Sequence, residues 1–310
     1  MKNLGYLLIL LCAICLSKSI SAQQLPQFSQ YMLNPYIINP AIAGCENELQ
    51  IRSTSKYQWT GITDAPRTFN LSFTNSAFGE KAGYGGLVYT DIAGPTRRIG
   101  LQGSGSYISP ITESLKFSIA LSLGITQYAV DGDKIDVRDI DDPLLADRLS
   151  SDFLFDARAG FYLHHEKYFF GFSIPNLTQT DIAPFVDEQP VGVLEPHYNL
   201  MAGYNYQIND DFEVQPSVLI KYVEPAPFKI DINVLATYRD QFWIGGGYRI
   251  NDGIIAQAGA NLNNRMMVSY AYDIITSDLS IYSGGVHEFL IGLNISKPEV
   301  ESVDETSGLD

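Results

Sequence analysis

The stretch 115-LKFSIALSLGITQ-127 decides the fold class, because its apolar side chains recur at every second position. One face carries Leu115, Phe117, Ile119, Leu121, Leu123 and Ile125, and the other carries lysine, serine, alanine, glycine and threonine. A period of two is that of a β-strand, whose successive Cβ atoms point to opposite sides. The apolar face must therefore pack against a second sheet or against lipid, and this stretch alone leaves both open.

The same alternation recurs along most of the chain. Clear repeats lie at 155–163, 198–206, 230–238 and 289–295, and two weaker ones lie near 49–60 and 83–91. Most repeats are ~9–11 residues long, the length of a tilted strand that crosses a bilayer, whereas strands of soluble sandwiches are nearer ~5–6 residues. The pattern predicts an all-β protein, a transmembrane antiparallel β-barrel of about 14 strands.

The connections between these repeats alternate in length. Tight ones lie at 164–167, 209–211, 239–241 and 263–265, and long ones at 129–152, 176–196 and 276–285. Outer-membrane barrels have short periplasmic turns and longer outer loops. With an even strand number and both termini periplasmic, the long connections all lie outside, although those at 224–227 and 251–253 are short. Hydrocarbon offers no hydrogen-bond partner to a backbone N–H or C=O group, so these groups must pair within the protein. A lipid-facing sheet must therefore close on itself, since open edges would leave such groups unpaired.

The faces opposite the apolar ones are polar and include Asp156, Arg158 and Lys221. A wet barrel lumen tolerates such side chains, but the solvent face of a sandwich does so equally well. Glycines such as Gly83 and Gly85 are expected to bend or bulge the wall.

The first 22 residues have the features of a secretory signal peptide. Lys2 is followed by the apolar run Leu4–Leu16 and by the small-residue site Ile20-Ser21-Ala22. The run is too short for a spanning helix, which needs ~20 residues. We expect cleavage after Ala22 and export. The processed chain then keeps Cys45 as its single cysteine, so no internal disulfide is expected.

Charge and composition divide the chain further. The net charge is −15, and removing a leader that holds two lysines and no acid makes it −17. This disfavours nucleic acid as a partner, because phosphate binding needs clustered lysine and arginine.

We expect a signal peptide at 1–22, an N-terminal periplasmic or lumenal segment at 23–48, the barrel at 49–296 and an acidic disordered tail at 297–310.

The sequence carries no recognisable catalytic or metal-binding pattern. Of the four histidines, His164 and His165 are adjacent and point apart in a strand, and neither His197 nor His287 has zinc-type spacing. No nucleophile elbow or phosphate-binding glycine loop occurs. The acidic segment 131–142 misses the spacing of a calcium loop. We therefore expect a protein that is not an enzyme and that has no cofactor.

Four segments resemble, in chain order, the PorP/SprF family of type IX secretion system outer-membrane proteins of Bacteroidetes-type bacteria. They are PQFSQYMLNPYIINPAIAG (26–44), KYQWTGITDAPRT (56–68), DIAGPTRRIGLQGSGSY (91–107) and the stretch 142–177. The likeness covers nearly all of 23–296. One position departs: Lys56 stands where many relatives have arginine, which puts a forked, bidentate contact there in doubt.

The resemblance implies a non-enzymatic barrel of the cell outer membrane. Members of this family help to export or retain cargo with a C-terminal sorting domain, in some cases gliding adhesins, and contact other type IX secretion components. The alternative is a passive porin or solute channel, which charged lumenal residues suit equally well.

Weak candidates for partner contact are Asn34, Pro35, Asn39, Pro40, Trp59 and Arg67. The first four are turn formers. They predict either a contact with the secretion machinery or a folded plug or lid that fixes the start of the first strand. For Trp59 and Arg67 the corresponding alternative is a structural role in the wall or lumen.

Overall fold

The computed structural model describes residues 25–134, 149–183, 190, 192–263 and 265–296. One antiparallel sheet contains β1 (Glu48–Tyr57), β2 (Arg67–Ala77), β3 (Ala82–Ala93), β4 (Thr96–Pro110), β5 (Leu115–Asp131), β6 (Leu149–His165), β7 (Tyr168–Ile174), β10 (His197–Tyr204), β11 (Tyr206–Asn209), β12 (Phe212–Val223), β13 (Lys229–Tyr238), β14 (Phe242–Arg249), β15 (Gly253–Asn261), β16 (Met266–Ile275) and β17 (Val286–Ser296).

The remaining elements are short. The strands β8 (Asp181–Ile182) and β9 (Gly192–Val193) form a separate pair. The 3-10 helices are η1 (Pro35–Ile37), η2 (Pro40–Ile42), η3 (Gly132–Lys134) and η5 (Asp278–Ile281). None of the helices in the described part of the chain has the length and apolar character to cross a membrane.

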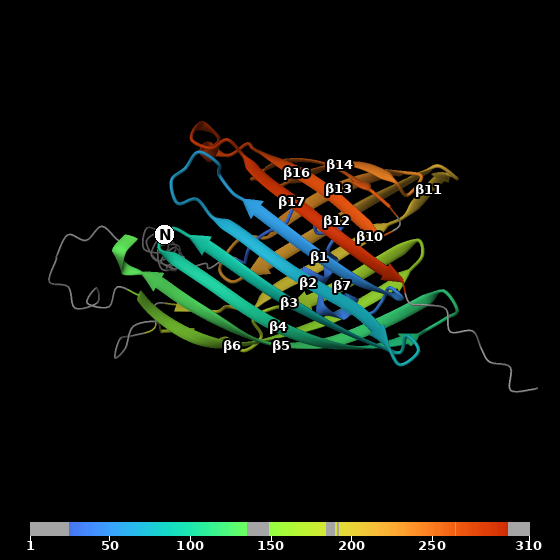
Figure 1. The fold of residues 1–310 in the computed structure, drawn as a ribbon, viewed down its shortest axis with the longest axis horizontal. Coiled ribbons are helices and arrows are strands. Elements are labelled where there is room, and N and C mark those ends of the chain that lie inside the picture. The colour runs from blue at the N-terminus through green and yellow to red at the C-terminus, as the bar shows by residue number, and fades with distance from the viewer. Residues whose placement is uncertain (1–24, 135–148, 184–189, 191, 264, 297–310) are drawn as a thin grey trace, which may run out of the picture.

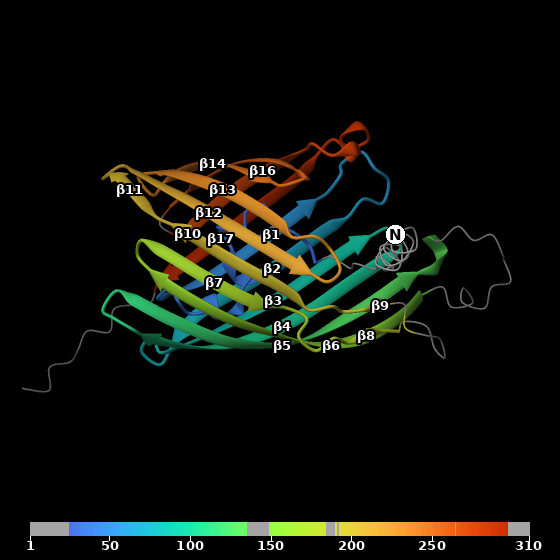
Figure 2. The same ribbon diagram turned by 180° about the vertical axis from the view of Figure 1, so that it is seen from behind.

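The sheet closes into a barrel because β10 pairs with β12 as well as with β7. Since β11 continues β10 beyond Asn205, the closed wall has 14 strands, and the predicted antiparallel barrel is confirmed. Strands that follow one another pair side by side, and the first strand, β1, pairs with the last, β17 (Figures 1 and 2).

The alternation of the opening stretch separates the outside of the barrel from its lumen. In β5, Leu121 is 53% and Leu123 is 63% exposed, whereas Ser118 and Ser122 are buried. The apolar side chains therefore cover the outer surface and the small polar ones face inward, as a membrane barrel requires.

The two ends of the barrel differ. At one, the short-turn end, β1 begins and β17 finishes, since Glu48 lies opposite Ser296. This end carries the connections 78–81, 111–114, 166–167, 210–211, 239–241 and 262–265. The other, the long-loop end, carries 58–66, 94–95, 175–196, 224–228, 250–252 and 276–285. β5 and β6 have 17 residues each, more than the ~9–11 expected for a spanning strand.

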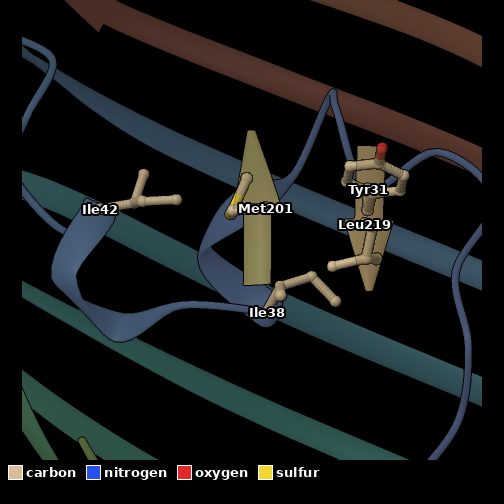
Figure 3. Close-up of a cluster of buried hydrophobic side chains, with 5 residues drawn as sticks. All are labelled: Tyr31, Ile38, Ile42, Met201 and Leu219. Carbon is tan, nitrogen blue, oxygen red and sulfur yellow. The ribbon is translucent and has the colours of Figure 1, made fainter. Parts of the chain in front are cut away.

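Residues 25–47, here called the plug, lie inside the barrel. Tyr31, Ile38 and Ile42 of the plug pack against Met201 of β10 and Leu219 of β12 (Figure 3). The plug runs from the long-loop end, where the Leu25 amide donates to Nε2 of His197 at 3.4 Å, to the start of β1. β1 starts and β17 ends at the short-turn end, as expected for an even number of strands.

Candidate functional site: a plugged lumen with two cavities

Two Asn-Pro pairs give the plug its local shape. Pro35 and Pro40 are the first residues of η1 and η2, a position where the fixed proline φ suits a helix and no backbone N–H is lost. Asn39 caps η2, since its Oδ1 accepts from the Ala41 amide at 3.0 Å. The four turn formers named from the sequence thus fold the segment into two compact turns.

The same asparagines bind the wall. Nδ2 of Asn34 donates to Oγ of Ser72 on β2 at 3.1 Å, and Nδ2 of Asn39 donates to the Phe161 carbonyl on β6 at 2.8 Å. Both asparagines are at least 97% buried. Their side chains therefore hold the plug to two separate parts of the barrel.

Glu288 of β17 grips the start of the plug. Its carboxylate accepts the backbone N–H of Ser29 and that of Gln30, each at 2.9 Å, and its carbonyl accepts from Nε2 of Gln30 at 3.0 Å. All three residues are buried. A buried carboxylate that receives two amide donors makes strong charge-assisted hydrogen bonds, so this contact fixes the plug in register with the last strand.

Cations complete this grip. Nζ of Lys56 lies 3.9 Å from Oε2 of Glu288 and donates to the Gln27 carbonyl. Lysine makes single-point contacts, consistent with the departure from arginine at this position. Nearby, Arg249 joins Asp231 at 3.1 Å and Asp273 at 3.0 Å.

The Arg249 cluster also reaches the plug. Oγ of Ser29 donates to Oδ2 of Asp273 at 2.6 Å and lies 3.4 Å from Nη2 of Arg249. Arg249, Asp273 and Ser29 are all buried. The attraction between Arg249 and Asp273, together with the hydrogen bonds of the Ser29 hydroxyl, offsets the free-energy cost of removing the two ions from water.

The opposite wall holds the middle and end of the plug. Nη2 of Arg158 on β6 donates to the Ile37 carbonyl at 2.7 Å, and the Tyr36 hydroxyl lies 2.6 Å from Oγ of Ser104 on β4. Oγ of Ser106 donates to the Ala43 carbonyl at 2.6 Å. The plug is therefore tied to strands on both sides of the lumen.

Glycines on the wall make room for the plug. A Cβ at Gly83 would lie 2.0 Å from the carbonyl oxygen of Ala43, and one at Gly160 would lie 2.2 Å from Oδ1 of Asn39. Neither distance is possible for a real side chain. Gly83 was expected to bend or bulge the wall; its role in this structure is to let the plug backbone approach.

Two cavities flank the start of the plug at the long-loop end, and residues 25–27 line both. The Lys221 cavity, about 110 Å³, is bounded by Phe28 of the plug and by Lys221 and Arg158 of the wall. The Trp59 cavity, about 240 Å³, is bounded by Trp59 of the connection 58–66 and by Arg249. Space for a ligand or a partner segment thus lies beside the plug.

The family of type IX secretion system membrane proteins named PorP/SprF matches residues 20–293. The chain belongs to this family. This PorP/SprF protein is accordingly an outer-membrane β-barrel component of the type IX secretion system.

One solved structure adds likeness of fold alone. The Ralstonia pickettii toluene transporter TbuX is 12% identical, with a TM-score of 0.51 over 85% of this chain and 93% of its own. CymD, a monoaromatic hydrocarbon channel, is 13% identical, with a TM-score of 0.48 over 88% of this chain and 94% of its own. Among curated proteins, none matches this sequence.

The partner-contact candidates of this PorP/SprF protein fall into two groups. Asn34, Pro35, Asn39 and Pro40 lie together inside the barrel, as described above. Trp59, at φ 49°, lines its cavity at the long-loop end. Arg67 is exposed on β2, apart from the plug. Contact with a partner stays a prediction for all six.

Three of the four histidines make hydrogen bonds, and His164, whose buried Nε2 has no such partner, stacks on Tyr162. Nδ1 of His197 lies 2.9 Å from the Glu195 carbonyl, which leaves Nε2 free to accept from Leu25. His287 contacts the Tyr270 hydroxyl at 2.7 Å. Within the described ranges, no group of three or more histidines, cysteines or acids could hold a metal ion. Residues 135–142, most of the acidic stretch 131–142 that misses the spacing of a calcium loop, lie outside the described residues.

Sequence reasoning missed the residues that grip the plug, above all Glu288 and Arg249. A signal was present: Phe289 and Ile291 face outward, so the alternation places Glu288 in the lumen. The sequence pattern did not indicate that its partner would be the backbone at Ser29, which is 259 positions away.

Proposed function

We propose that this PorP/SprF protein is a plugged docking barrel that supports export or surface retention of a secreted partner carrying a C-terminal sorting domain. Its contribution is to hold the partner and other type IX components, without a chemical step. Membership of the PorP/SprF family supports a role in type IX secretion, and the plug inside the barrel supports docking.

The single observation that carries the proposal is the plug. Residues 25–47 cross the lumen, and buried contacts from Glu288, Arg158 and Ser106 hold them on opposite sides. A rigid, filled barrel suits a platform whose loops and end surfaces bind other proteins. An open channel would need this segment to leave.

The passive porin is the rival reading. It predicts steady conductance of small solutes through the reconstituted protein, whereas the plugged platform predicts a closed barrel. The solved neighbours are transporters and channels, but at 12–13% identity they speak for the fold alone.

One preparation tests both readings. The tagged barrel is purified from solubilised outer membrane and offered an immobilised sorting domain, and the same sample is reconstituted for liposome swelling. We expect retention of the barrel by the sorting domain and no swelling. Swelling without retention would overturn the docking proposal in favour of the channel. A folded soluble protein carrying the same tag serves as the retention control.

A further inference from the structure

The Lys221 cavity has an apolar body. Phe28 and Leu87 line it on one side and Val223 and Ala226 on another, all of them buried. An apolar cavity of ~150 Å³ accommodates benzene. At about 110 Å³, this one suits an apolar group of roughly four or five carbon-sized atoms.

Buried polar atoms without partners line the same space. Neither the nitrogen nor the oxygen of the Asn70 side-chain amide has a hydrogen-bond partner, and the same holds for Oδ1 of Asp156 and Nε of Arg158. These three residues are 5–6% exposed. An unsatisfied buried polar group costs ~1–3 kcal/mol and calls for a specific explanation. A bound polar group could satisfy these four atoms, which all belong to residues that line the one cavity.

The charges around the cavity favour an anion. Lys221 of β12 and Lys229 of β13 lie directly opposite each other in the register, where like charges repel. Neither lysine makes an ion pair or hydrogen bond with another described residue. With Arg158, three basic side chains line the cavity, and Asp156 is the one carboxylate among the described residues that line it, in a chain whose net charge is −15.

We infer that the Lys221 cavity binds a short-chain carboxylate: the anionic head lies between Lys221 and Lys229, and the apolar body lies against Phe28 and Val223. The carboxylate belongs to a free short-chain acid or to the carboxyl end of a peptide that finishes in a small apolar residue. Because Phe28 is part of the plug, a bound ligand also buttresses the plug from the long-loop end.

Calorimetric titration of the full-length barrel in lipid nanodiscs tests this site. The probes are butyrate and a short peptide with a free C-terminal valine, each paired with its uncharged amide. We expect saturable binding of at least one acid, at least ~10-fold weaker binding of its amide, and a similar loss in Lys221→Met. Whichever acid binds more tightly identifies the source of the carboxylate.

The matched control is Lys116→Met, which removes a partly exposed lysine paired with Glu80 at the short-turn end. It should bind as the unaltered protein does. A heat-modifiability gel shift confirms that each variant is a folded barrel before titration. Binding of neither acid, equal binding of acid and amide, or undiminished binding in a folded Lys221→Met barrel would overturn the inference.

Discussion

Adding one methyl group at Gly83 should displace the end of the plug. The new Cβ of Gly83→Ala would lie 2.0 Å from the Ala43 carbonyl oxygen and 2.5 Å from its carbon, so the plug backbone has to move by about 1 Å or more. That movement breaks the 2.6 Å hydrogen bond from Ser106 to Ala43. Gly44, at φ +77°, has no room to compensate because it also abuts Gly83.

The magnitude follows from these contacts. Overpacking of a filled interior costs ~1–3 kcal/mol, and loss of a typical hydrogen bond costs ~0.5–1.5 kcal/mol. We expect Gly83→Ala to lower the free energy of unfolding by about 2–4 kcal/mol in total. The measurement is equilibrium unfolding in urea from lipid vesicles, with single-channel conductance as a second readout of plug displacement.

Gly105→Ala is the matched control. Gly105 lies on β4, next to Ser106, the residue that pairs with Gly83 across the two strands. A Cβ at Gly105 meets nothing within 4 Å. It should leave both stability and conductance unchanged. If Gly83→Ala unfolds at the same urea concentration as Gly105→Ala and stays equally closed, wall glycines do not seat the plug and this reasoning is wrong.

Three further predictions concern the plug and its connection to β1. Glu288→Gln leaves Lys56 buried without its counter-charge, so we expect a loss of about 3 kcal/mol in urea unfolding, partly restored by adding Lys56→Met; no loss would contradict the grip. Burial raises the pKa of the Cys45 thiol from 9.0 to about 12, so maleimide should label it ~1000-fold more slowly at pH 8 in the folded barrel than in urea, and equal rates would refute this. Tyr36→Phe removes the bond to Ser104 and should cost ~1 kcal/mol, whereas a gain in unfolding free energy would show that this bond does not stabilise the plug.

The barrel could be predicted from the sequence because its signal is local. In β5, the alternation of Leu121 and Leu123 with Ser122 sets which side meets lipid, and each strand repeats this independently. Closure then follows from the need to pair every backbone group in hydrocarbon. Even the weaker repeat near 49–60 is a wall strand, β1.

The plug's position could be predicted only in part. Asn34-Pro35 and Asn39-Pro40 mark turns, and a lumenal plug was one of two interpretations. Its direction through the barrel depends on contacts such as Ser29 with Glu288, which join opposite ends of the chain. The sequence around an inward-facing charge such as Arg158 is the same whether that side chain contacts water or a backbone carbonyl of the plug. The local pattern therefore does not distinguish a water-filled lumen from a plugged one.

The register of the first and last strands has a consequence for assembly. Lys56 on β1 and Glu288 on β17 are direct cross-strand partners, so the groups that hold residues 27–30 lie on the two strands that join the beginning and the end of the wall. A wall in which β1 and β17 have not paired lacks this joint contact of Lys56 and Glu288 with the plug. A barrel in which β1 and β17 have not paired should therefore leave residues 25–47 open to protease.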